Sequence, residues 1–298
     1  THPATVTRDP DKSGTAVVWS LLHLMGGSMQ VGPLSLSNTA GTLSGTPMLA
    51  GYYEGSGVGV LFYAPGMAVV VGNTMYVADT SNHRIRKIDL LTTVGTTLSG
   101  TGTAGGSDGA VGVAQFNAPW GICADATYLY VTDSGGHTVR RVSMADGTVL
   151  TLAGQSGTPT FADADGTAAG LNSPQGICLA GGNLYVVDNG KHCVRKVVPT
   201  SPYTVTTFAG TATSAGFDDG ALGTGDFYYP HGVATDGTKF WVADGYDDWG
   251  GAISGTWVRE VAADGYVTTV AGASGNYQAG YTNASGTGAR FNGLRGIL

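Results

Sequence analysis

The chain has 298 residues, of which 50 are glycine, and only 12% are Asp, Glu, Lys or Arg. Glycine without an every-third-residue period excludes collagen, and 42% apolar residues argue against a disordered, highly charged chain. A formal net charge of −7 gives no electrostatic footprint for nucleic acid, and the longest apolar run, 16–25, is too short to insert into a membrane. We therefore expect a soluble, turn-rich globular chain.

Internal repetition organises the sequence from its start to its end. Residues 1–45 read as a degenerate first copy, residues 46–290 as four regular copies, and residues 291–298 as the opening strand of a further copy. The anchoring prolines Pro65, Pro119, Pro174 and Pro230 recur at intervals of 54, 55 and 56 residues. A period of this size indicates one repeated supersecondary unit per copy.

Each regular copy contains four short runs of Val, Ile, Leu, Tyr, Thr and Phe, separated by Gly, Asp, Asn and Pro. The first runs follow the anchoring prolines. The second runs are 75–79, 129–133, 184–188 and 240–244, the third are 84–87, 137–141, 192–196 and 257–260, and the clearest fourth runs are 149–154, 205–210 and 267–272. Four antiparallel strands per copy, repeated radially, predict an all-β protein, a β-propeller of four-stranded blades. Five blades are readable, together with the start of a sixth.

The repeated sequence motifs resemble those of the NHL-repeat propeller family. They are a Phe-Asn-x-Pro-x-Gly-Ile opening, a Leu-Tyr-Val-x-Asp strand, a His-x-Val-Arg-Lys strand and a Val-Thr-Thr-Leu-Ala-Gly ending, with Asn82-His83-Arg84 as the Asn-His-Leu-like box. The resemblance covers about residues 40–298 well and residues 1–40 poorly. It implies a single six-bladed propeller domain over residues 1–298, which we expect to be part of a longer chain, and an interaction platform as the usual role of the fold.

Side chains that recur at one blade position are expected to be structural, since an active site is needed only once. An aspartate ends each second strand and an arginine lies on each third strand. The aspartates are Asp79, Asp133, Asp188 and Asp244, and the arginines are Arg86, Arg140, Arg195 and Arg259. A carboxylate that caps a strand-end turn and pairs with a guanidinium explains this pattern. His83, His137 and His192 also recur, a blade width apart, which favours turn-stabilising imidazoles over a shared zinc site.

Unrepeated residues are the candidates for binding. The residue between the opening proline and the following glycine differs from copy to copy, and we expect it at one mouth of the central channel. The residues at this position are Trp120, Gln175, His231 and Arg295. A second candidate is an insertion in the last regular copy, between the second and third strands on the same face of the disc. It carries Tyr246, Asp247, Asp248 and Trp249. Loops on a rigid scaffold often carry function, and aromatic side chains are common anchors of interfaces.

Sites for metals and modifications have weaker signals. Asp9-x-Asp11-x-Ser13-Gly14 resembles the start of a calcium loop, but Ser20 stands at the twelfth position, where a bidentate Glu is expected. A turn explains this segment, so we expect no metal and no cofactor, with calcium left open as an alternative. Cys123, Cys178 and Cys193 have no metal spacing and read as small hydrophobic residues. Asn283-Ala-Ser285 is a glycosylation pattern whose use depends on secretion.

Two classes of function remain open. The first is a non-catalytic protein-interaction or structural module of a larger secreted or cell-surface protein, such as an extracellular assembly or filament. The alternative is a propeller lyase or hydrolase with a metal-assisted site at the channel mouth, which His231 and Arg295 support. No nucleophile elbow, zinc motif or pair of catalytic carboxylates accompanies them, so the interaction module is favoured. Eight of the 14 Lys and Arg residues lie in the repeated third-strand box, which leaves few for phosphate contacts.

Overall fold

Four antiparallel sheets form the described part of the molecule, a computed structural model that describes residues 43, 50–212, 214–245, 256–272, 282, 284–289, 291 and 294–297. We name the sheets blades A to D. Blade A comprises β2 (Ala68–Val71), β3 (Thr74–Asp79), β4 (Arg84–Asp89) and β5 (Val94–Ser99). Blade B comprises β6 (Pro119–Ala124), β7 (Tyr128–Asp133), β8 (Thr138–Ser143) and β9 (Val149–Ala153). The expected four-stranded unit is therefore confirmed in these two copies.

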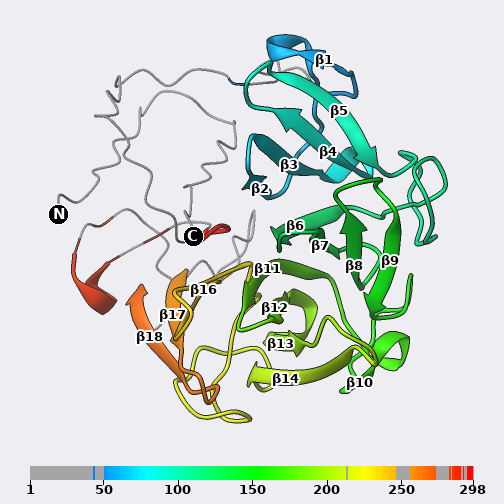
Figure 1. Ribbon diagram of the computed structural model, residues 1–298. Coiled ribbons are helices and arrows are strands. Elements are labelled where there is room, and N and C mark those ends of the chain that lie inside the picture. The colour runs from blue at the N-terminus through cyan, green and yellow to red at the C-terminus, as the bar shows by residue number, and fades with distance from the viewer. Residues whose placement is uncertain are drawn as a thin grey trace.

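The next two copies repeat the same strand order. Blade C comprises β11 (Pro174–Ala180), β12 (Asn183–Asp188), β13 (Cys193–Val197) and β14 (Thr204–Gly210). Blade D comprises β15 (Gly232–Thr235), β16 (Phe240–Asp244), β17 (Trp257–Val261) and β18 (Val267–Gly272). Figure 1 shows the four sheets arranged radially about a common centre, with the first strand of each sheet innermost. The predicted all-β propeller of four-stranded antiparallel blades is confirmed.

The hydrophobic core lies between neighbouring blades rather than inside any one of them. Because side chains alternate across a strand, each blade presents one face to the blade before it and one to the blade after it. Tyr76 and Ala78 of blade A thus pack against Leu129 and Val131 of blade B. Two further clusters fill the spaces between blades B and C and between blades C and D. This explains the Tyr-Val-x-Asp strands, which are apolar on both faces.

Short connecting segments cover the outer edges of the blades. β1 (Gly55–Ser56) pairs with β5, and β10 (Ala164–Asp165) pairs with β14, each as a fifth strand of its sheet. A one-turn 3₁₀ helix follows each, η1 (Gly57–Gly59) and η3 (Gly166–Ala168). In blades B and D, single bridges join Gly109 to Val149 and Gly220 to Val267 at the equivalent place. The Asp-Gly connectors therefore pair with the outermost strands.

The remaining one-turn helices lie in loops. η2 (Thr80–Asn82) and η4 (Asn189–Lys191) join the second and third strands of blades A and C, and η5 (Gly286–Gly288) contacts β18 of blade D. No helix in the described ranges is long and apolar enough to cross a membrane. The predicted degenerate first blade, 1–45, falls almost wholly outside the described residues.

Candidate functional site

The recurring Asp and Arg form a buried ion pair in all four described blades. The Arg Nη1 to Asp Oδ2 distances are 3.0 Å for Arg86 and Asp79, 3.3 Å for Arg140 and Asp133, 3.2 Å for Arg195 and Asp188, and 2.9 Å for Arg259 and Asp244. All eight residues are fully buried. The other carboxylate oxygen accepts a backbone N–H from the opening segment of the same blade, for example from Asn172 at 2.8 Å to Asp188. Each pair thus joins three parts of one blade.

The guanidinium also binds the connector that precedes its blade. Arg195 donates from Nη1 to the carbonyl oxygen of Gly170 at 2.8 Å, and from Nη2 to the carbonyl oxygen of Ala162 at 3.0 Å and to Asp163 at 2.7 Å. Asp163 in turn accepts from the backbone N–H and the hydroxyl of Thr207 on β14. Blades B and D repeat this arrangement through Asp108 and Asp219. The arginine therefore connects the second strand of its blade to the preceding connector and, through the connector aspartate, to the fourth strand.

Burial is the largest influence on the pKa values of the aspartates in these pairs. Burial raises the pKa of Asp133 and of Asp188 to about 7 and that of Asp244 to about 6, while the neighbouring arginine and the backbone N–H groups act in the opposite direction. Titratable groups with shifted pKa values often mark functional sites. Here the same shift recurs at one position of several blades, and the carboxylates are closed off from solvent. The geometry is that of a structural network.

The recurring histidines connect one blade to the next. Nδ1 of His83 accepts the backbone N–H of Ala118 at 3.0 Å, and Nδ1 of His137 accepts that of Ser173 at 3.0 Å. His192 makes the same contact with Tyr229 at 3.2 Å. The acceptor role fixes Nδ1 as the unprotonated nitrogen of each ring. These imidazoles lie in the turn of one blade and bind the opening segment of the next, a partner that their spacing in the sequence does not reveal.

A second set of contacts between blades was missed by the sequence argument. Thr80 donates its hydroxyl to the carbonyl oxygen of Pro119 at 2.7 Å, and Asn189 donates its side-chain amide to that of Pro230 at 2.9 Å. Thr132 reaches the carbonyl oxygen of Gln175 at 2.5 Å. Each of these side chains adjoins the aspartate of its own blade in the sequence. Their position next to the recurring aspartate could have marked these residues as structural. It does not reveal a hydrogen-bond partner that lies more than 35 residues away in the sequence.

The unrepeated residues lie at the start of successive innermost strands. Trp120 and Gln175 are the second residues of β6 and β11, His231 directly precedes β15, and Arg295 lies in the described stretch 294–297. Their backbones are fixed by the preceding blade: Met67 donates its N–H to the carbonyl oxygen of Trp120 at 2.8 Å, and Gly176 donates to that of His231 at 2.8 Å. The structure thus holds four different side chains on a repeated backbone frame, which we call the mouth ring.

Glycine is required in this frame because the backbones of neighbouring blades touch. A Cβ atom on Gly176 would lie 2.6 Å from the carbonyl oxygen of His231, and one on Gly232 would lie 2.7 Å from that of Arg295. Both distances are far shorter than an ordinary van der Waals contact. The contact to Arg295 also puts residues 294–297 beside blade D in the place that Gln175 and His231 occupy beside the earlier blades. That residues 291–298 open a further blade remains a prediction from the sequence.

Two members of the mouth ring contact each other through their side chains. Nδ1 of His231 lies 2.5 Å from Oε1 of Gln175. His231 is 4% exposed, while Trp120 and Gln175 are half-buried and Arg295 is exposed. Burial, followed by the positive charge of Arg295, lowers the pKa of His231 to about 4. His231 is therefore neutral at pH 7, and with Nδ1–H donated to Gln175 its Nε2 carries a lone pair.

The pKa of His231 gives a testable dependence of stability on pH. Its folded pKa lies below the usual 6.5 of an unfolded chain, so the unfolded state binds more protons between pH 6.5 and 4. Stability that is present above pH 6.5 is therefore lost as the pH falls. We expect the wild-type protein to lose on the order of 2 kcal/mol relative to a His231→Gln variant between pH 7.5 and 5.

Urea denaturation at both pH values measures this difference. The buried aspartates titrate in the same way in the two proteins, so their contribution cancels. A stability difference between variant and wild type that stays constant over this range would contradict the assigned environment of His231.

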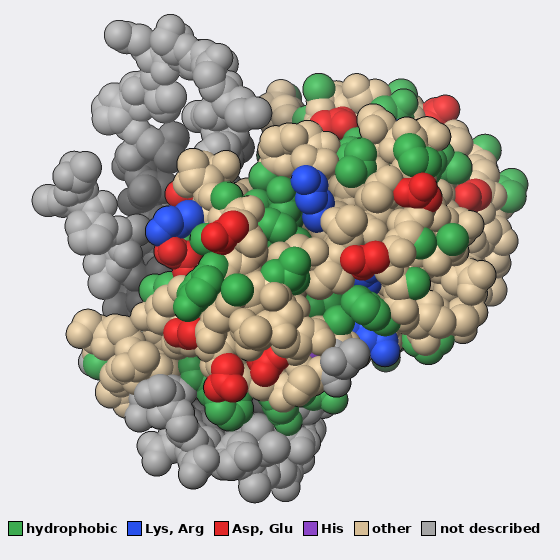
Figure 2. Space-filling view, turned by 90° about the horizontal axis from the view of Figure 1, so that it is seen from below, with side chains coloured by type: hydrophobic (Ala, Val, Ile, Leu, Met, Phe, Trp, Pro, Cys, Tyr) green, Lys and Arg blue, Asp and Glu red, His purple; other side chains and the backbone are tan. Residues whose placement is uncertain are grey.

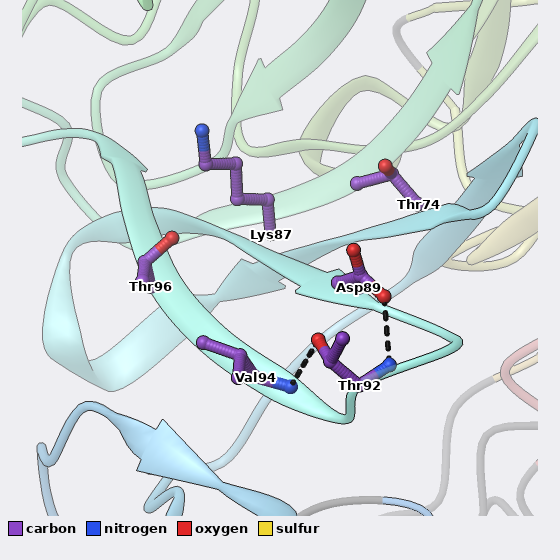
Figure 3. A pocket seen from close by; sticks show the side chains of 6 residues that line it. All are labelled: Thr74, Lys87, Asp89, Thr92, Val94 and Thr96. Atoms are coloured by element: carbon purple, nitrogen blue, oxygen red, sulfur yellow. Dashed lines mark hydrogen bonds between the residues drawn. The ribbon is translucent and has the colours of Figure 1, made fainter.

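A shallow hollow of about 370 Å³ lies on the rim of blade A (Figure 3). Thr74, Lys87, Asp89, Thr92, Val94 and Thr96 line it. A similar hollow lies on blade B, lined by Tyr128, Arg141, Ser143, Asp146, Thr148 and Leu150, and every one of these positions is 54 residues further along the chain. Because the hollow recurs with the repeat, it follows from the blade geometry and is not a candidate site.

The described residues contain no group of three or more His, Cys, Asp or Glu side chains arranged to hold a metal ion. Cys193 is buried, and Cys123 and Cys178 are half-buried. Burial raises the pKa of the Cys178 thiol to about 12, so it is protonated at neutral pH. Figure 2 shows one face of the molecule, on which acidic and hydrophobic side chains are scattered and few basic ones appear.

Several predicted features lie outside the described residues. They are the insertion residues Tyr246, Asp247, Asp248 and Trp249, the glycosylation candidate Asn283 and the calcium-like segment from Asp9 to Gly14. These remain predictions from the sequence.

Comparison with known proteins finds a family match in blade C. The family model described as NHL repeat matches residues 171–197, which run from the opening segment through β13. Residues 171–197 are an NHL repeat. The match includes Asp188, His192 and Arg195, the three side chains whose contacts were described above. The resemblance to the NHL-repeat family is thereby confirmed.

Curated relatives match parts of the chain at modest identity. The chain is 27% identical to Protein SUPPRESSOR OF QUENCHING 1, chloroplastic, of Arabidopsis thaliana, with 65% of this chain and 25% of the relative covered. It is 29% identical to human NHL repeat-containing protein 2, with 46% of this chain and 22% of that protein covered. The chain thus spans about a quarter of the length of these relatives.

Solved structures with a similar fold are distant in sequence. A structural genomics protein of unknown function from Bacteroides thetaiotaomicron is 22% identical, with a TM-score of 0.47, and the match covers 86% of this chain and 69% of that chain. A chain in the crystal structure of a nidogen/laminin complex is 19% identical, with a TM-score of 0.48, and the match covers 70% of this chain and 64% of that chain.

Proposed function

We propose that this NHL-type propeller is a non-catalytic protein-interaction module that binds a partner protein at the mouth ring. The observation that carries the proposal is the contrast within that ring. The backbones of Trp120, Gln175 and His231 are fixed by contacts with the preceding blade, whereas the side chains differ in size, polarity and charge. A rigid frame with varied side chains is a common basis of specific recognition.

The energetics of an interface also favour this location. Trp120 is a half-buried aromatic residue whose backbone is already ordered, so little entropy is lost when a partner covers it. Tryptophan and arginine are the residues most enriched at the energetic centres of protein interfaces, and Arg295 is exposed in the same ring. We include the predicted insertion residues 246–249 in the proposed surface.

The proposal has two further parts. We place the module in a larger secreted or cell-surface protein, where it contributes to an extracellular assembly, on the basis of the low charge content and the Asn283-Ala-Ser285 triplet. We also propose that binding needs no metal and no cofactor. Dialysis against a chelator that binds calcium and zinc is expected to leave partner affinity unchanged, and a loss of affinity would overturn this part.

The test compares two exposed or half-exposed apolar side chains at opposite ends of the disc. A partner is first identified by chemical cross-linking in an extract of the source organism, and its affinity is measured by calorimetry. Trp120→Ala is expected to weaken binding at least tenfold, which corresponds to about 1.4 kcal/mol. Leu91→Ala serves as the control, because Leu91 lies in the turn after β4 at the other end of the disc and is 75% exposed. Equal affinity of both variants would contradict the proposed surface.

A further inference from the structure

Gln175 keeps two hydrogen-bond donors available in the mouth ring. Its Oε1 atom is engaged by His231, 2.5 Å from Nδ1. Its amide nitrogen has no hydrogen-bond partner in the described part of the chain, and it is not one of the unpartnered atoms closed off from solvent. The two N–H groups of this amide are therefore accessible to a ligand.

Arg295 adds a positive charge at the next position of the ring. Among the arginines that the structure describes, it is the one whose guanidinium has no hydrogen bond, ion pair or aromatic contact. The others bind aspartates, carbonyl oxygens or an aromatic ring. Arg295 is exposed, and after burial its charge is the further cause of the lowered pKa of His231. The guanidinium therefore lies near that imidazole.

These two side chains flank His231. Gln175 and His231 touch although they come from successive blades, so neighbouring positions of the ring are within side-chain reach of each other. The backbone of Arg295 packs against Gly232 as that of His231 packs against Gly176. His231 is 4% exposed and neutral at pH 7, so it holds the Oε1 end of Gln175 and leaves the N–H end for a ligand.

The charge and the donors together define the ligand chemistry. A carboxylate accepts hydrogen bonds at two oxygens, and a guanidinium matches its planar geometry. A phosphate group carries about −1.5 to −2 charges at pH 7. The mouth ring offers it a single cation, because Trp120, Gln175 and neutral His231 carry no charge. One positive charge beside an amide donor thus suits a singly charged carboxylate.

We propose that the mouth ring binds the carboxylate of an aspartate or glutamate side chain on the partner protein. Arg295 forms the ion pair, and the amide of Gln175 donates to the second oxygen. This inference rests on the proposed function, because it names the group that the partner presents. It adds selection by charge to the apolar contact expected at Trp120.

The experiment uses the full chain labelled with ¹⁵N at pH 7 and the blocked tripeptide Ac-Gly-Asp-Gly-NH₂ as the probe. We expect progressive shifts of the Gln175 side-chain amide and of the Arg295 Nε–H signals. The peptide Ac-Gly-Asn-Gly-NH₂ has nearly the same shape without the charge. It is expected to bind roughly fivefold more weakly or less.

Two variants and a matched control assign the effect to these residues. Arg295→Gln and Gln175→Glu are each expected to raise the dissociation constant of the Asp peptide roughly fivefold or more. Gln175→Glu keeps an acceptor for His231 but replaces the N–H donors with a negative charge. Lys87→Gln removes the same charge as Arg295→Gln, from an exposed lysine in the hollow on the rim of blade A, and should leave binding unchanged.

Three results would overturn the proposal. One is equal binding of the Asp and Asn peptides, and another is an equal effect of Arg295→Gln and Lys87→Gln. The third is binding of Ac-Gly-Gly-Gly-OH when the Asp peptide does not bind, which would mean that the ring recognises a chain end.

The proposed function fails or stands separately. If Trp120→Ala weakens partner binding but the Asp peptide does not bind, the carboxylate site alone is wrong. If the Asp peptide binds as expected but Trp120→Ala leaves partner affinity unchanged, the carboxylate site stands and the proposed partner surface is wrong.

Discussion

Replacing Arg195 with methionine is expected to lower the free energy of unfolding by about 3 to 5 kcal/mol. The substitution keeps most of the side-chain volume but removes the guanidinium. It would leave Asp188 buried without its charged partner, and the carbonyl oxygens of Gly170 and Ala162 without their donors. Breaking one side of a buried ion pair is costly because the remaining charge cannot be solvated.

The neighbouring residue supplies a matched control. Lys196 follows Arg195 on β13, but its side chain points to the other face and is half-buried. Lys196→Met is expected to change stability by less than about 0.5 kcal/mol, as is usual for surface substitutions. Urea denaturation followed by tryptophan fluorescence measures both variants. Similar losses in the two would show that the arginine network is not the centre of blade C.

Substituting Gly176 with alanine is expected to cost about 1 to 3 kcal/mol through overpacking. The added methyl group would meet the carbonyl oxygen of His231 and the Cα of Gly232, both backbone atoms of blade D. Backbone atoms cannot rotate away, so blades C and D would have to separate slightly. The strain would act where the mouth ring is formed.

Gly59→Ala is the control for this prediction, because a Cβ atom at Gly59 meets nothing within 4 Å. It should be neutral within about 0.5 kcal/mol. Thermal unfolding by calorimetry of the two variants and the wild type distinguishes the cases. A Gly176→Ala variant as stable as Gly59→Ala would mean that the inner strands are less closely packed than the structure shows.

Local periodicity was enough to predict the blade, because each blade is built from residues close together in the sequence. Asp188 and Arg195 are only seven residues apart in the sequence. They lie on adjacent antiparallel strands joined by a short turn, so the position of one strand predicts the position of the other. The regular spacing of Pro65, Pro119 and Pro174 then predicts that the unit repeats, and this prediction needs no knowledge of contacts between blades. The strand bounds observed for β7 and β12 agree with the predicted second strands within one residue.

Contacts between blades could not be read in the same way. The acceptor for Thr80 lies 39 residues ahead, and the donor to His83 lies 35 residues ahead. No spacing in the sequence connects these atoms until the blades are placed side by side. For the same reason the sequence does not predict the contact between His231 and Gln175, which are 56 residues apart, although both residues are candidates for binding.

The connectors that pair with β5 and β14 have a consequence for self-association. An uncovered outer strand offers free N–H and C=O groups on which a second molecule can extend the sheet. In blades A and C the two-residue strands β1 and β10 occupy one end of that row, and in blades B and D a single bridge does so. Copies of these four blades are therefore hindered from joining rim to rim as one continuous sheet. Stacking through their flat ends remains open to them.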